Sequence, residues 1–310
     1  MKIFLTGGTG FIGSHVLMKL LQNGHNVTVL ARNKNKIPAL HKLSDVKIIE
    51  GSVGDYKLIE KSITGHDACI HVALFWGEPG AYKMLENDTA ASAFLADAAA
   101  KAGCKQFIYT SSTAVNDYFY MVPGNEREDK SKLVLVSSKQ KPVTYYGATK
   151  AATENFMLAI SYQTNMKVNI VRPGYTFGNP AHAGAPTQAD NRFKDIALNA
   201  KNGVNIEITK NDGTQFIYAG DLAEIYIRIL NSGVNRKTYF GLSKEFYSWH
   251  EVAKEAVKLA NSKSNIKIVD KGHDNDPVIF DVSDIKNDFG LVFNPRNQII
   301  EHLKYYQGLS

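Results

Sequence analysis

Short apolar runs alternate with amphipathic segments over the first half of the chain. The apolar runs predict buried β-strands, and they lie at residues 2–6, 26–31, 46–50, 68–73, 106–110 and 167–172. The segments between them repeat their apolar positions with helical spacing, at residues 11–23, 56–63, 87–102 and 146–164. Such alternation predicts an α/β fold in which helices cover both faces of a parallel sheet.

This alternation is lost in two places. Residues 116–142 predict a long loop over the carboxyl edge of the sheet, where α/β proteins bind their ligands. Beyond Arg172 the pattern becomes irregular and predicts short helices and strands. We therefore expect a sheet domain together with a smaller, interleaved C-terminal lobe that binds the substrate. The expected sheet domain comprises residues 1–174 and about 215–235, and the expected lobe comprises residues 175–214 and about 236–310.

The composition is typical of a soluble globular protein, with 44% apolar and 21% charged residues in a chain of 310. Although the net charge is +6, the lysines are scattered, which favours a solvated surface over a nucleic-acid partner. The N-terminus lacks a signal-peptide pattern, and no apolar run approaches the ~18 residues of a membrane span. We therefore expect a cytoplasmic protein without a membrane segment.

Neither the cysteines nor the histidines have the spacing of metal ligands. Cys69 and Cys104 form no CxxC pair, and Cys69 lies in an apolar run that is typical of a packed, reduced thiol. The histidines show no HxH or HExxH pattern. We therefore expect no metal site.

A glycine-rich turn, TGGTGFIG, directly follows the first predicted strand and opens the first predicted helix. Gly7 permits the tight turn, Gly10 lets backbone amides approach a pyrophosphate, and Gly13 lets helix and strand pack closely. Phe11 and Ile12 lie at the helix N-terminus, whose free amides and positive dipole end attract phosphates. Three glycines also occur by chance, but their place between strand and helix predicts a dinucleotide site on a doubly wound Rossmann sheet.

The end of the second predicted strand bears on the choice of cofactor. An acidic residue there would bind the adenosine ribose of NAD, but this chain has Ala31 followed by Arg32 and, further on, Lys36. A guanidinium pairs well with a 2′-phosphate. A basic surface loop without a ligand is the alternative interpretation. We expect NADP(H) to be favoured over NAD(H).

Three side chains suggest proton transfer. Tyr146 and Lys150 lie one helical turn apart on the same helix face, and Ser112 follows a buried strand. By itself a serine at a strand end more often caps a turn. Free tyrosine titrates near pH ~10, and a lysine cation stabilises its phenolate, which then accepts a proton from a secondary alcohol. The pattern predicts a catalytic trio in which Ser112 holds the substrate oxygen.

The chain resembles the extended short-chain dehydrogenase/reductases, which include NAD(P)-dependent sugar epimerases, dehydratases and ketone reductases. The resemblance covers nearly the whole chain and rests on motifs in the family's order and spacing: TGxxGxxG at 6–13, YTSSTAV at 109–115, YxxxK at 146–150, RPGYTFG at 172–178, FIYAGDLA at 216–223 and FGLVFNP at 289–295. It implies a Rossmann fold, a nicotinamide cofactor and oxidoreductase or epimerase activity.

The resemblance also implies roles for individual residues. Ser112 would be the catalytic hydroxyl, with Thr113 as the less favoured substitute, and Lys150 would also bind the nicotinamide ribose. Asn87 matches an asparagine of the family, whereas Ser52 replaces the usual aspartate beside the adenine. The cofactor cleft would include Asn87, Ser52, Val53, Val72, Ala73 and Pro173. The expected substrate contacts are Trp76, Ser112, Thr113 and Tyr175.

Two departures from the family narrow the expected activity. Dehydratases of the family carry an Asp-Glu pair after the catalytic hydroxyl, but here Thr113 and Ala114 follow Ser112, which disfavours dehydration. Nucleotide-sugar enzymes commonly place an arginine between the DGTQ turn and the FIY strand, and this chain has none there. The possible substitutes are Arg192, Arg228, Arg236 and Arg296.

Together with Arg32, these departures favour a net NADPH-dependent reductase that acts at a secondary alcohol or ketone carbon. One alternative is a nucleotide-sugar 4-epimerase, which regenerates its cofactor in every cycle. Another is a cofactor sensor without catalysis, although the intact trio argues against it. The expected partner is a small molecule, either an alcohol or ketone or a sugar nucleotide, and by analogy with the family the chain forms a homodimer.

Overall fold

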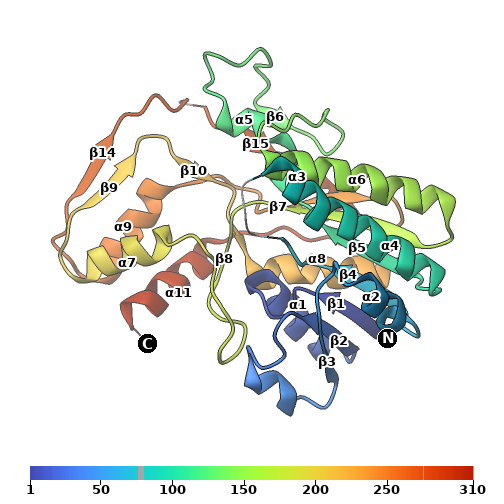
Figure 1. Ribbon diagram of the computed structural model, residues 1–310. Helices are drawn as coiled ribbons and strands as arrows, with labels where there is room; N and C mark the ends of the chain where they lie inside the picture. The colour runs from blue at the N-terminus through green and yellow to red at the C-terminus, as the bar shows by residue number, and fades with distance from the viewer. Residues whose placement is uncertain (76–79, 275, 310) are drawn as a thin grey trace.

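A seven-stranded parallel sheet forms the centre of the molecule in the computed structural model, which describes residues 1–75, 80–274 and 276–309 (Figure 1). The strands lie in the order β12-β7-β5-β4-β1-β2-β3. Chain order reverses where β1 lies between β2 and β4, and doubly wound sheets bind ligands at this point. The strands are β1 (Lys2–Thr6), β2 (Asn26–Ala31), β3 (Val46–Glu50), β4 (Ala68–His71), β5 (Gln106–Thr110), β7 (Lys167–Pro173) and β12 (Thr238–Gly241).

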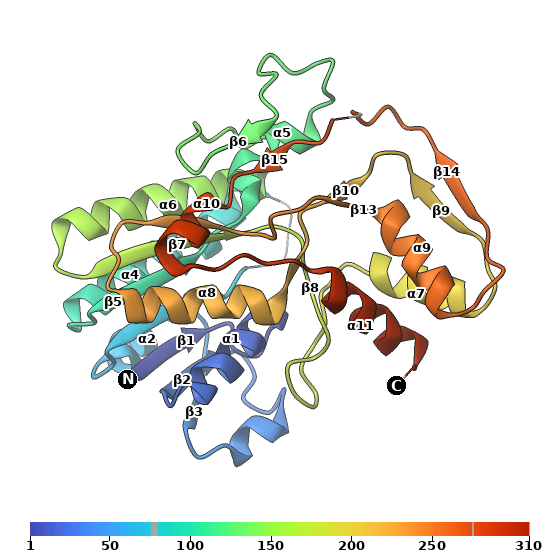
Figure 2. The ribbon, with the colours of Figure 1, turned by 180° about the vertical axis from the view of Figure 1, so that it is seen from behind.

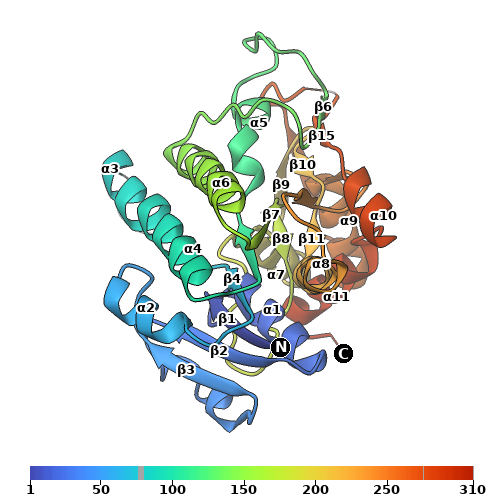
Figure 3. The ribbon, with the colours of Figure 1, turned by 90° about the vertical axis from the view of Figure 1, so that its right-hand side faces the viewer.

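Helices cover both faces of this sheet, as the alternating pattern predicts. Figure 3 shows α1 (Phe11–Gln22) and α8 (Ala219–Ser232) on one face. The other face carries α2 (Tyr56–Ile63), α4 (Ala91–Lys101) and α6 (Tyr145–Gln163). The strands between them are buried on both sides, and their apolar side chains form two clusters, one on each face. The predicted α/β class and doubly wound sheet are therefore confirmed.

A smaller lobe stands beside the carboxyl edge of the sheet (Figures 1 and 2). Three helices, α7 (Arg192–Lys201), α9 (Trp249–Leu259) and α11 (Arg296–Gln307), pack around a core of their own. Its centre is aromatic: the rings of Phe177, Phe193, Phe216 and Trp249 contact one another edge to face or stacked. Parallel strands β9 (Ile206–Thr209) and β14 (Ile266–Val269) complete the lobe.

Short elements join the two parts. Three two-stranded pairings occur, β8 (Thr176–Phe177) with β11 (Ile217–Tyr218), β10 (Gly213–Thr214) with β13 (Tyr247–Ser248), and β6 (Leu133–Val134) with β15 (Ile279–Phe280). The remaining helices are α3 (Ala81–Met84), α5 (Tyr118–Met121), α10 (Ser283–Phe289), the 3-10 turns η1 (Pro38–Lys42) and η3 (Thr113–Asn116), and the π-helical turn η2 (Leu85–Ala90).

Some boundaries differ from the sequence-based expectation. β12 joins the sheet although its residues were assigned to the lobe, because it pairs with β7 at the sheet edge. The helix expected to begin at residue 87 starts differently: residues 87–90 belong to the π turn η2, and the α-helix α4 follows this turn. The predicted loop at 116–142 contains α5 and β6. Within the described residues, no helix is long and apolar enough to span a bilayer.

A buried polar chain ties the lobe to α1. His302 on α11 contacts the Asn179 Oδ1 atom at 2.7 Å and the Gln188 amide nitrogen at 2.8 Å. Because that amide nitrogen donates, the His302 Nε2 atom accepts and Nδ1 carries the proton. The Asn179 carbonyl in turn meets His15 of α1 at 3.0 Å. Burial lowers the pKa of His302 to about 4, so the folded protein holds this ring neutral.

This neutral ring predicts a loss of stability in acid. An unfolded histidine binds a proton below about pH 6.5, whereas folded His302 resists it down to about pH 4, so unfolding is favoured as the pH falls. Urea unfolding should show that His302→Asn removes about 2 kcal/mol of the stability difference between about pH 7 and about pH 5. An equal pH dependence in wild type and variant would contradict this assignment.

Candidate active site

The β1–α1 turn forms a cradle that glycine alone permits. Gly7 has a φ of 76°, and a Cβ atom there would lie 2.6 Å from the Ala73 backbone nitrogen. A Cβ atom on Gly13 would overlap the Gly7 carbonyl. Gly10 precedes α1 without a side-chain cap, so the first amides of the helix are left for a ligand. Phe11 and Ile12, partly buried, form the first helical residues.

Buried His71 stabilises the segment after β4, which lies against the glycine turn. His71, at the end of β4, meets the Thr6 hydroxyl at 2.6 Å and the Ser92 hydroxyl at 2.8 Å. The Ala73 amide donates to the same Thr6 oxygen, so the predicted cleft residues Val72 and Ala73 lie directly beside the glycine turn. Burial and then the Lys150 charge lower the pKa of His71 to about 3, and the ring is therefore neutral.

The basic segment after β2 is exposed. Arg32 and Lys36 both lie on the surface just beyond buried Ala31. Lys34 between them is tied down, since its amide and its ammonium both contact the Glu50 carboxylate. Exposed Ser52 and half-buried Val53 follow β3 at the same edge of the sheet. Pro173 is the buried last residue of β7.

Ser112 and Tyr146 come together because α6 packs on the turn after β5. The Ser112 Oγ atom accepts from the Ala114 amide at 3.1 Å and caps η3. Gly147, next to Tyr146, touches this turn so closely that a Cβ atom would overlap the Ala114 carbonyl. Tyr146 faces the site, whereas Tyr145 is 59% exposed.

Buried Asp117 fixes the start of α6. Its carboxylate accepts from the Val143 amide at 2.6 Å and from the Thr144 amide and hydroxyl. Thr144 in turn caps α6, since its hydroxyl accepts from the Gly147 amide at 3.0 Å. This carboxylate therefore places the first turn of α6 relative to η3, and with it Tyr146.

Lys150 lies behind the tyrosine and is almost completely buried. Its ammonium group is 5.9 Å from the Tyr146 ring centre and 3.4 Å from the Thr110 carbonyl. The Asp88 carboxylate lies 3.3 Å away, with both side chains only 2% exposed. Asp88 was missed by sequence reasoning because its partner is far away in the chain. The signal available in the sequence is that Asp88, an ionisable residue, lies on the apolar side of the helix predicted at residues 87–102.

The side chain of Asn87, which the resemblance places at the cofactor, forms a hydrogen bond within its own helix. The residue is exposed, and its amide donates to the Lys83 carbonyl at 3.0 Å on the same helix. The π turn η2 instead directs its neighbour Asp88 towards α6. A contact between Asn87 and the cofactor therefore stays a prediction from the resemblance, and in the described part of the chain its side-chain amide bonds within its own helix.

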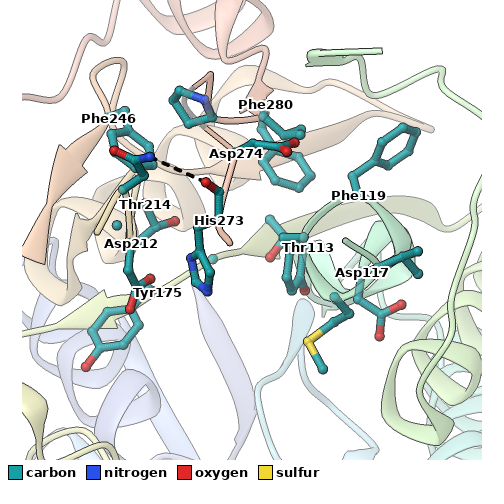
Figure 4. A pocket seen from close by; sticks show the side chains of 18 of the residues that line it. Thr113, Asp117, Phe119, Tyr175, Asp212, Thr214, Phe246, His273, Asp274 and Phe280 are labelled. Atoms are coloured by element: carbon teal, nitrogen blue, oxygen red, sulfur yellow. Dashed lines mark hydrogen bonds between the residues drawn. The ribbon is translucent and has the colours of Figure 1, made fainter. Parts of the chain in front are cut away.

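A cavity of about 700 Å³ opens in front of the trio, between the sheet domain and the lobe. Ser112, Thr113, Tyr146 and Tyr175 all line it. Figure 4 shows Thr113 and Tyr175 on different sides of the cavity. Much of the remaining wall is apolar or aromatic and includes Phe119, Tyr120, Leu242, Phe246, Trp249 and Phe280. Trp76, also predicted to contact substrate, lies outside the described residues. The expected loop 116–142 does form part of the wall.

Of the four arginines considered as phosphate partners, Arg192 lines this cavity and the others do not. Its guanidinium lies over the Trp249 ring at 4.4 Å and pairs with Asp190 at 2.9 Å and Asp212 at 3.6 Å. Arg127, also in the wall, pairs with Asp274 at 2.5 Å. Both arginines are therefore already charge-compensated. Within the described residues, no cluster of His, Cys, Asp or Glu could hold a metal ion.

Comparison with known proteins shows the family of this chain. The pattern of the NAD dependent epimerase/dehydratase family matches residues 3–240. A dTDP-D-glucose 4,6-dehydratase of Dictyostelium discoideum is 24% identical over 277 residues, 84% of this chain and 62% of that protein. A UDP-glucose 4-epimerase 3 of Oryza sativa subsp. japonica is 29% identical over 265 residues, 74% of this chain and 67% of that protein. The chain thus spans roughly two thirds of these relatives.

A solved structure shares the whole fold. UDP-glucuronic acid 4-epimerase from Bacillus cereus, in complex with NAD, superposes with a TM-score of 0.81 at 18% identity, covering 99% of both chains. The seven-stranded sheet and the smaller lobe are thus common to both proteins. With the family pattern matched over more than half of its length, the chain belongs to the NAD dependent epimerase/dehydratase family of the extended short-chain dehydrogenase/reductases.

Proposed function

We propose that the protein is a nucleotide-sugar epimerase, which oxidises a secondary alcohol of its substrate and reduces it again from the other face. One observation carries this proposal: Ser112 and Tyr146 line the same cavity, and the Lys150 ammonium lies 5.9 Å from the Tyr146 ring centre. The relatives and the solved structure above include epimerases of UDP-sugars, which supports this reaction over the net reduction first expected.

The glycine cradle fits a nicotinamide dinucleotide. Gly7 and Gly13 leave no space for a side chain, and the uncapped start of α1 offers amides to a pyrophosphate. When bound there, the dinucleotide supplies the hydride acceptor and donor that amino-acid side chains lack. Lys150, whose ammonium lies 5.9 Å from the Tyr146 ring centre, is the residue expected to contact the nicotinamide ribose of the dinucleotide.

Each member of the trio has a separate task. Ser112 accepts from the Ala114 amide, so its hydroxyl hydrogen remains to be donated to the substrate oxygen. Tyr146 takes the proton from the substrate hydroxyl and later returns it. The Lys150 cation stabilises the phenolate form of Tyr146 through its charge.

The cavity wall suits a substrate that must turn over between two reaction steps. Thr113 and Ala114 stand where dehydratases of the family carry an acid and a base, so elimination of water lacks its second proton carrier. Apolar and aromatic side chains share this wall with polar ones such as Asp212, Thr214 and His273, and the apolar part allows an oxidised sugar to present its other face. A cavity of about 700 Å³ lies within the usual range of ligand sites.

Net reduction of a ketone by NADPH is the second candidate. Arg192 and Arg127 are compensated by aspartates, which weakens their attraction for a substrate diphosphate. Exposed Arg32 after β2 suits the 2′-phosphate of NADP, the cofactor of net reductions. Consumption of NADPH with ketones, set against interconversion of UDP-sugars without net change in cofactor absorbance, separates the two candidates.

Tyr146→Phe should lower turnover by at least about 100-fold, because the acid/base hydroxyl is lost while the ring stays. Cofactor affinity, measured by fluorescence titration, should be unchanged. Tyr145→Phe is the matched control, since that exposed neighbour should retain wild-type turnover. Full turnover in the Tyr146 variant would refute the proposed role.

Gly13→Ala should weaken cofactor binding by about tenfold or more, because its methyl group would displace the Gly7 carbonyl at the cradle. Isothermal titration with NAD(H) and NADP(H) measures this effect. Gly80→Ala is the control, because a Cβ atom there meets no neighbour among the described residues and φ is −86°. Equal affinities in the two variants would contradict the placement of the pyrophosphate.

Arg32→Ala should reduce the preference for NADP(H) over NAD(H) by about tenfold, since one charge-assisted contact to the 2′-phosphate is lost. The ratio of the two dissociation constants is the quantity to measure. Lys42→Ala, which removes an exposed cation further along the chain, should leave that ratio unchanged. A wild-type preference for NAD(H) would rule out this role for Arg32.

A further inference from the structure

Lys150 and Asp88 form an ion pair next to the candidate active site, and both are unusual for charged side chains because they are buried. Lys150 and Asp88 are each 2% exposed, and the Asp88 Oδ2 atom has no hydrogen-bond partner among the described residues although it lies 3.3 Å from the ammonium. Removing two charges from water costs several kcal/mol per ion. A lysine–aspartate pair in this position therefore adds little net stability, and net stability does not explain its presence.

The chain places Asp88 there by a local change in helix geometry. Residues Leu85–Ala90 form the π turn η2, and such turns are frequent at functional sites. Glu86 and Asn87 on this turn face solvent, whereas Asp88 and Thr89 are buried against α6. The Thr89 hydroxyl donates to the Thr149 carbonyl at 3.1 Å, which holds the turn beside Lys150.

Several titratable groups face the Lys150 ammonium from the surrounding elements. They are Asp88 on η2, His71 on β4, Tyr109 on β5, Tyr146 on α6 and Tyr226 on α8. Burial raises the pKa of Tyr109 and of Tyr226, so both phenols stay neutral, and burial lowers that of His71. Asp88 is the one carboxylate among them.

Burial by itself lowers the pKa of Lys150, but its interactions with Tyr109, Asp88 and Tyr146, in that order, outweigh burial, and the pKa lies above its usual value. Because the Tyr109 phenol is neutral, the carboxylate of Asp88 is the neighbour that sustains the ammonium charge. Without it, a fully buried lysine tends to lose its proton near neutral pH.

We propose that Asp88 is a positioning residue that keeps the Lys150 ammonium charged and in place, and thereby sets the pH at which Tyr146 ionises. Asp88 is not among the residues that line the cavity, and its carboxylate lies 3.3 Å from the Lys150 ammonium. It acts on the reaction through the lysine alone. The inference rests on the proposed function only for the part that Tyr146 plays in proton transfer.

Ultraviolet difference titration of the intact chain tests this without substrate or cofactor. The phenolate absorbance of wild type minus that of Tyr146→Phe isolates the ionisation of Tyr146, and the same subtraction is made in the Asp88→Asn background. The midpoint should rise by about one pH unit or more in Asp88→Asn, because the cation 5.9 Å from the ring is lost. An unmoved or lowered midpoint overturns the proposal.

Two further variants make the result specific. Glu86→Gln removes a carboxylate from the same turn, but an exposed one paired with Lys83, and its midpoint should equal that of wild type. A midpoint raised equally by Glu86→Gln would overturn the proposal, because any charge on the turn would then suffice. Asp88→Glu keeps the charge and should restore the wild-type midpoint at least in part.

If Asp88→Asn does not fold, Asp88→Asn combined with Lys150→Met removes both buried charges together. The same upward shift is expected, since Tyr146 has then lost its cation, and Lys150→Met by itself should give an equal midpoint because Asp88 acts only through the lysine. Unequal midpoints in these two variants would overturn the proposal. An unchanged midpoint in this double variant would show that the pair has no net influence on Tyr146 and would overturn the proposal. Because no turnover is measured, failure here is distinct from failure of the proposed reaction.

Discussion

The close contact between α6 and the turn after β5 is the constraint on which the active site depends. Gly147 has no side chain, so the helix approaches the Ala114 carbonyl to a distance that any Cβ atom would prevent. Asp117 then fixes the start of the helix through the Thr144 cap. One contact therefore brings Ser112 and Tyr146, which lie on different elements, to the same cavity wall.

Buried charges hold the remainder of α6 in register with the sheet. Glu154 receives two hydrogen bonds from Arg172 of β7, at 2.9 and 2.7 Å, and a third from Gln140. Four residues earlier, Lys150 pairs with Asp88 of η2. Such pairs add little net stability, but leaving one partner alone in the interior is costly, so they select a single position of the helix.

Chemistry and recognition are divided between the two parts of the molecule. The sheet domain supplies the glycine cradle and the trio, whose geometry comes from strand ends and one helix. The lobe and the loops supply the rest of the cavity wall, with Tyr175 and Phe246 (Figure 4) and also Trp249 among its aromatic members. Under the proposed function, a change of this wall would alter the substrate without disturbing Ser112, Tyr146 and Lys150, because these residues are held by the sheet domain.

The sequence by itself determined the elements and the trio, because their signals are local. Strand and helix patterns, the glycine turn and the Tyr146–Lys150 spacing each lie within one short segment, and the strands appear close to where they were predicted. What depends on distant residues required the tertiary structure. The Asp88–Lys150 pair joins residues on two helices, and β12 enters the sheet by pairing with β7. Asp212 and Asp274 meet Arg192 and Arg127, respectively, only in the folded chain. Burial and long-range pairing, which no local pattern encodes, decided those features.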